Sequence, residues 1–135
     1  MNRILPLLAA LLGASCGYTT SIGTELTELQ RVQSGNIEVV LLAPTDALKQ
    51  TRNYCTLDFG TGADHHLIDV GTITVRTTMT MEGQPMDGFV TEAKRVGTGR
   101  YEVQMVMAMT GTWRIGIDWD GASGQGSATF ETVVH

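Results

Sequence analysis

Residues 100–119 read RYEVQMVMAMTGTWRIGIDW, and the alternation of apolar and polar side chains along this stretch decides the fold class. Successive side chains of a β-strand point to opposite faces of the sheet. Tyr101 and Val103 therefore share one face, while Glu102 and Gln104 share the other. The Thr-Gly pair at 110–111 is a turn signal, after which the alternation resumes. The stretch thus predicts two consecutive strands that each bury one face.

Similar short alternating segments, separated by Gly, Asp, Asn and Pro, occur on both sides of this stretch. Such a succession of strands and turns is typical of an all-β sandwich. We predict a seven-stranded immunoglobulin-like antiparallel β-sandwich, with strands at residues 36–43, 53–59, 70–80, 89–96, 100–109, 112–119 and 127–134. The apolar faces of these strands supply the predicted core: Leu57, Ile73, Val75, Tyr101, Val103, Met105, Trp113, Ile115, Ile117 and Phe130.

The first fifteen residues have the composition of an export signal. A short basic start precedes the apolar run ILPLLAALLGA, which is too short to span a bilayer but suits a signal peptide. The run ends in LGASC, which resembles the lipobox of bacterial lipoproteins, although Gly13 departs from that pattern. This resemblance implies that Cys16 is acylated and becomes the first residue. A plain secretory peptide cut nearby is the alternative.

These features divide the chain into three predicted parts. Residues 1–15 form a signal peptide of the lipoprotein type, residues 16–34 a polar, lipid-anchored tether, and residues 35–135 the β-sandwich domain. If Cys16 is acylated, Cys55 is the one remaining thiol, whereas a Cys16–Cys55 disulfide is open if the lipid is absent. Two cysteines are too few for a disulfide scaffold, so a hydrophobic core must hold the domain.

The charge of the chain bears on its partners. The net charge is −5, and it becomes −6 when Arg3 is removed with the signal peptide. No cluster of Lys and Arg interrupts this acidic balance. Because phosphate binding needs a concentrated basic surface, we predict no nucleic-acid partner. The predicted contacts are the bacterial envelope membrane, through the N-terminal lipid, and a protein partner within that envelope.

Methionines are gathered in one part of the sequence. Apart from Met1, all six lie between residues 79 and 109. Because consecutive strands of an antiparallel sandwich alternate in direction, one end of the domain should collect the residues of a "methionine pole": Met81, Met86, Met107, Met109 and the C-terminal His135. Thioethers are soft ligands that suit Cu(I) and carry no proton to displace. Methionine also fills cores, which is the predicted role of Met79 and Met105.

The order of several motifs resembles the YtkA-like domain, which is related to the FixH family. The first motif is a strand that ends in a methionine-rich turn, here with Met79, Met81 and Met86. The second is a glycine before an aromatic residue, here Gly99 and Tyr101, and the third is a Met-x-Gly-x-Trp step, here Met109, Gly111 and Trp113. Members often have MPxM in the turn, where this chain has MEGQPM. The resemblance implies an immunoglobulin-like sandwich in the bacterial envelope, associated with copper or with the assembly of copper-containing enzymes.

Other candidate chemistry is weaker. Asp64, His65 and His66 lie before the third predicted strand and should be at the end of the domain opposite the methionine pole. No catalytic set of nucleophile, base and acid stands out, so we predict that the protein is not an enzyme. Two hypotheses follow: a Cu(I)-binding accessory protein with Met81, Met86 and Met109 as main ligands, or a non-metal immunoglobulin-like module that docks onto a membrane-complex partner.

Overall fold

The computed structural model describes residues 25–135, and this part of the chain contains nine β-strands and no helix. The predicted signal peptide and Cys16 lie outside the described residues. The strands are β1 (Thr27–Ser34), β2 (Ile37–Ala43), β3 (Thr51–Thr61), β4 (Thr72–Met81), β5 (Gln84–Glu92), β6 (Lys94–Gly97), β7 (Arg100–Met107), β8 (Gly111–Gly121) and β9 (Gly124–Val134). Between residues 25 and 135 there is accordingly no helix that could cross a membrane.

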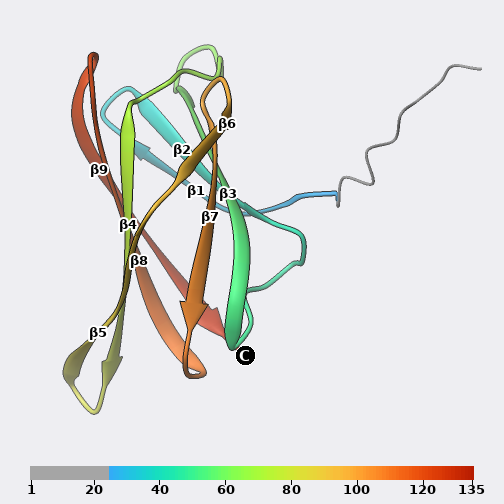
Figure 1. The fold of residues 1–135 in the computed structure, drawn as a ribbon, viewed down its shortest axis with the longest axis vertical. Helices are drawn as coiled ribbons and strands as arrows, with labels where there is room; N and C mark the ends of the chain where they lie inside the picture. The colour runs from blue at the N-terminus through green and yellow to red at the C-terminus, as the bar shows by residue number, and fades with distance from the viewer. Residues whose placement is uncertain (1–24) are drawn as a thin grey trace, which may run out of the picture.

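The strands form two antiparallel sheets that pack face to face, as Figure 1 shows. One sheet has five strands in the order β1-β2-β3-β7-β6, and the other has four in the order β5-β4-β8-β9. A single cluster of buried apolar side chains from both sheets lies between them. The predicted antiparallel sandwich is therefore confirmed, with nine strands where we expected seven.

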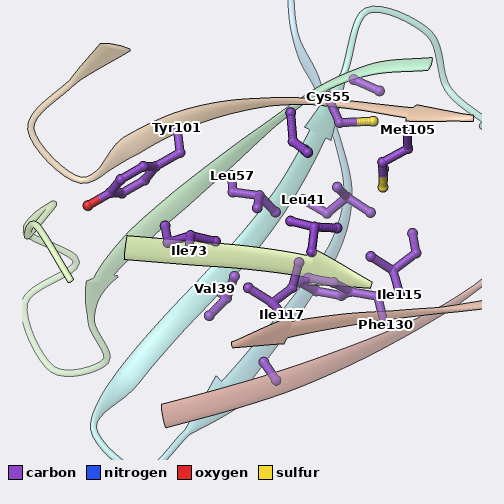
Figure 2. Packing of buried hydrophobic residues seen from close by; sticks show 14 of the residues in the cluster. Val39, Leu41, Cys55, Leu57, Ile73, Tyr101, Met105, Ile115, Ile117 and Phe130 are labelled. Carbon is purple, nitrogen blue, oxygen red and sulfur yellow. The ribbon is translucent and has the colours of Figure 1, made fainter. Parts of the chain in front are cut away.

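The predicted core is confirmed in full. All ten residues that the alternation assigned to the interior are buried, and Figure 2 shows most of them pointing into the space between the sheets. The Phe59 ring meets Tyr101 and Trp119 edge to face, with both ring-centroid distances 5.4 Å. The Tyr101 hydroxyl accepts a hydrogen bond from the Val70 N–H at 3.1 Å, so its polar end is satisfied within the core.

The prediction of a tether up to residue 34 was wrong in its last part. Residues Thr27–Ser34 form β1, which pairs along its length with β2 through a two-residue turn at Gly35 and Asn36. Gly35 has a φ of +61°, a conformation that glycine adopts without strain. Because β1 is an edge strand with no fully buried side chain, it lacks the apolar alternation that marks the other strands.

The predicted strand 89–96 is two strands in two sheets. β5 ends at Glu92 in the four-stranded sheet, and β6 begins at Lys94 in the five-stranded sheet. Between them, the Ala93 N–H donates a hydrogen bond of 3.0 Å to the Ile73 carbonyl as the chain crosses from one sheet to the other. β5 also begins earlier than predicted, at Gln84, so the methionine-rich turn is part of a β-hairpin rather than a loop.

Candidate metal centre

The β4–β5 hairpin carries three of the six methionines. Its turn consists of Glu82 and Gly83, which lie between the paired residues Met81 and Gln84. Their φ values of +51° and +79° fit a type I′ turn, the form whose twist suits a two-residue hairpin. In Figure 1 this hairpin extends beyond the body of the sandwich, at the end where β7 and β9 also finish.

The pairing of the two strands places the three methionines on one face. Met79 lies directly opposite Met86, and side chains of directly opposed residues point to the same face of a sheet. Met81 is two residues beyond Met79 on β4 and therefore shares that face. Opposed Cβ atoms are about 5 Å apart and diagonal neighbours about 7 to 8 Å apart, which long side chains can bridge. The three hairpin methionines, Met79, Met81 and Met86, thus form one group on a shared face of the hairpin.

Two of these side chains are accessible from solvent. Met81 and Met86 are each 42% exposed, whereas Met79 is 6% exposed and belongs to the core cluster. The methionine group therefore extends from the edge of the core to the surface of the hairpin. Burial of Met79 agrees with the predicted packing role, but its register opposite Met86 adds a thioether to the site that the sequence did not indicate.

Met109 approaches the same region from the turn between β7 and β8. Trp113 is the cross-strand neighbour of Met79 on β8, and its indole Nε1–H donates a 2.9 Å hydrogen bond to the Met109 carbonyl. The Met79 Cε atom lies close enough to Gly111 that a Cβ on that residue would be 2.5 Å away. Met79 therefore reaches from the hairpin to the turn that contains Met109, whose side chain is partly buried against the core.

The structure does not bring the other two predicted ligands to this group. Met107 is fully buried within the core, opposite Thr51 of β3. The His135 carbonyl accepts a 3.1 Å hydrogen bond from the Gln50 N–H, which fixes the C-terminus beside β3. β9 lies three strand positions from β5 in the four-stranded sheet, or about 14 Å at the usual strand spacing. His135 thus lies at the predicted end of the domain but away from the hairpin.

Harder ligands form no alternative site in the part of the chain described. Between residues 25 and 135, no three His, Cys, Asp or Glu side chains are arranged to hold a metal ion. The His65 Nδ1 atom lies 3.3 Å from Glu38 Oε1 and is exposed. Burial of Cys55 in the core raises the pKa of its thiol to about 12, so it is not available as a thiolate at neutral pH.

Comparisons with known proteins agree with the fold. The family model described as YtkA-like matches residues 31–118. A copper-bound variant of FetP from uropathogenic Escherichia coli strain F11 is similar in structure, with a TM-score of 0.56 and 11% identity over 81% of this chain and 97% of that chain. FetP of the same strain as isolated, expressed recombinantly in the E. coli periplasm, gives a TM-score of 0.54 and 13% identity over 82% and 97%. A search of curated proteins finds no match.

Proposed function

Since this chain belongs to the YtkA-like family, we propose that it is an accessory protein of the bacterial envelope that binds Cu(I) through methionine side chains and passes it to a copper enzyme. The observation that carries the proposal is the shared face of Met79, Met81 and Met86 on the β4–β5 hairpin. Met109 is the fourth candidate ligand, from the adjacent turn. We assign the protein no catalytic step.

The residues present fit a Cu(I) ion. Three or four thioethers supply the soft ligands that Cu(I) prefers, and they bind without losing a proton. They also remain usable in an oxidising compartment, where paired thiols would form a disulfide. The exposure of Met81 and Met86 provides access for an incoming ion or a partner protein. Cu(I) would be the cargo of the protein, and the hairpin would provide the sulfur atoms that bind it.

The proteins of similar structure also favour a copper-related function in the bacterial envelope. This chain shares at low identity the fold of FetP, of which a variant is known in a copper-bound form and which was expressed recombinantly in the periplasm. By analogy, we place this protein in the bacterial envelope, with its domain held at the membrane by a lipid on Cys16. The partner that we propose is a copper-containing enzyme or membrane complex in the same envelope.

Exposed apolar side chains on β5 favour the second candidate function, a non-metal interaction module. Phe89 and Val90, on the same strand as Met86, are 45% and 57% exposed. However, β5 is poorly suited to pair with a strand of another protein. It is an edge strand that contains Pro85, which lacks an N–H, and its ladder is interrupted between Asp87 and Val90. A partner would therefore contact side chains rather than extend the sheet.

Met86→Leu should lower Cu(I) affinity without unfolding the domain. Leucine keeps the size and hydrophobicity of methionine but removes the sulfur, so stability should stay within about 1.5 kcal/mol of wild type. Anaerobic titration of Cu(I) against a competing chelator measures the affinity, and thermal unfolding measures the stability.

Met105→Leu is the matched control, because Met105 is fully buried in the core and away from the hairpin. It undergoes the same chemical change and should leave Cu(I) affinity unchanged. Equal affinities for wild type and Met86→Leu would remove Met86 from the proposed ligands, and a wild-type domain without stoichiometric uptake would favour the interaction module.

Cys16→Ser should release the protein from the membrane. Without the thiol no lipid can be attached, and the remaining predicted tether cannot hold the domain at a bilayer. Fractionation of cells that express the wild-type chain or the variant, followed by immunoblotting, measures the distribution. The wild-type chain should sediment with membranes and the variant should not. Wild-type protein in the soluble envelope fraction would contradict lipid anchoring and favour the plain secretory peptide.

A further inference from the structure

β5 contains one extra residue opposite Thr77. Thr78 is paired with Asp87, but Arg76 is paired with Val90, so Thr77 lies opposite both Gly88 and Phe89. Such an insertion is a β-bulge, which interrupts the ladder and shifts the register by one residue. The hairpin methionines lie on one side of the bulge, and the crossing into β6 lies on the other.

The Thr77 side chain holds this bulge from inside the sandwich. Thr77 is almost completely buried, and its Oγ1 accepts a hydrogen bond of 2.8 Å from the Phe89 N–H. The same hydroxyl donates a longer bond of 3.4 Å to the Phe89 carbonyl. The N–H and the carbonyl of Phe89, which are displaced from the ladder, thereby both bond to one side chain.

Gly88 allows the close approach of the two strands at this point. A Cβ on Gly88 would lie 2.5 Å from Thr77 Oγ1 and 2.9 Å from Trp113 Cζ3, distances that real Cβ atoms essentially never show. The bulge therefore packs against the same indole whose N–H binds the Met109 carbonyl. Thr77, Gly88 and Trp113 form a single junction beneath the methionine group.

The register decides on which face Met86 lies. With the bulge, Met86 is opposite Met79, and Thr91 is opposite the buried Val75. If the bulge closed while the Thr91 pairing was kept, the hairpin would slip by one residue and Met86 would be opposite Thr80. A slip of one residue turns a side chain to the other face of a sheet. Met86 would then point away from Met79 and Met81.

We propose that Thr77 is a positioning residue that, by fixing the β5 bulge, keeps the Met86 thioether on the same face as Met79 and Met81. The proposal rests on the copper site proposed above for its functional meaning, but its structural content is independent of metal. Thr77 does not touch the ion. It acts through the backbone of Phe89, two residues beyond Asp87 and three beyond the ligand.

The test compares Thr77→Val, which removes the hydroxyl at nearly constant shape, with Thr77→Ser, which retains it. Two quantities are measured: Cu(I) affinity by anaerobic chelator competition, and the nuclear Overhauser effect between the methyl groups of Met79 and Met86 in the metal-free protein. Thr77→Val should weaken Cu(I) binding by about 10 to 100-fold, the range usual for residues that orient a ligand. It should also lose the methyl–methyl signal, whereas Thr77→Ser should retain both properties.

The two readouts separate this inference from the proposed function. If Thr77→Val keeps the Met79–Met86 signal, or if Thr77→Ser loses it as well, the hydroxyl does not set the register and the inference is overturned. If wild type takes up no Cu(I) but the signal follows the hydroxyl as expected, the copper function fails while Thr77 retains its structural role. Should Thr77→Val not fold, Thr77→Ala takes its place, with the same expected results.

Discussion

Ile115→Ala is expected to reduce the free energy of unfolding by about 2 to 5 kcal/mol, the range for truncating a buried isoleucine. Ile115 is fully buried near the middle of β8, between Thr77 on one neighbouring strand and Phe130 on the other. Removal of three methylene-sized groups leaves a cavity that two paired strands on either side cannot close. Denaturant unfolding, followed by tryptophan fluorescence and circular dichroism, measures the loss, which is a large share of the roughly 5 to 15 kcal/mol typical of a domain.

Val133→Ala is the matched control for this experiment. Val133 lies in β9 and its side chain is 50% exposed, so truncation should leave no enclosed cavity. Substitutions at such surface positions usually change stability by no more than about 0.5 kcal/mol. An Ile115→Ala loss as small as that of Val133→Ala would mean that the core does not lie where the alternation of β8 places it.

The core could be predicted because it depends on local alternation. In β7 and β8 every second residue is apolar and buried, which sets the inner face without any knowledge of the partners. β1 and β5 could not be recognised in this way. Both are edge strands without a fully buried side chain, so burial imposes little pattern on their sequences. The Gly-Asn pair at 35–36 was a usable hairpin signal for β1.

The residues of the candidate site could be predicted only in part, because their arrangement depends on strand register as well as on strand direction. Sequence position alone brought Met81, Met86 and Met109 to one end of the domain, because strand direction determines which ends meet. The opposition of Met79 and Met86 depends on a two-residue turn and on a bulge held by Thr77. A change of one residue in the turn or in the bulge would move Met86 to the other face of the hairpin. The alternation of apolar residues does not determine strand pairing to within one residue. The distance of His135 likewise follows from strand order, which the sequence does not state.

Replacement of all three hairpin methionines, Met79, Met81 and Met86, by leucine is expected to abolish Cu(I) uptake by the domain. The change removes each sulfur from the shared face while retaining similar apolar volume, so packing at the buried Met79 should be preserved. Met109 would remain as a single thioether, and one soft ligand cannot provide the three or four donors of a Cu(I) site. Equilibrium dialysis under anaerobic conditions, with copper and protein both quantified, measures the stoichiometry.

The double variant Met105→Leu with Met107→Leu is the control for this loss. Both residues are buried in β7, so the pair tests whether methionine content as such, rather than position on the hairpin, accounts for copper uptake. The control should bind as wild type does, and circular dichroism should show the same β-sheet spectrum for all three proteins. Unchanged uptake by the folded hairpin variant would exclude these thioethers as the site. The exposed apolar side chains of β5, Met86, Phe89 and Val90, would then be better explained as contacts for a protein partner.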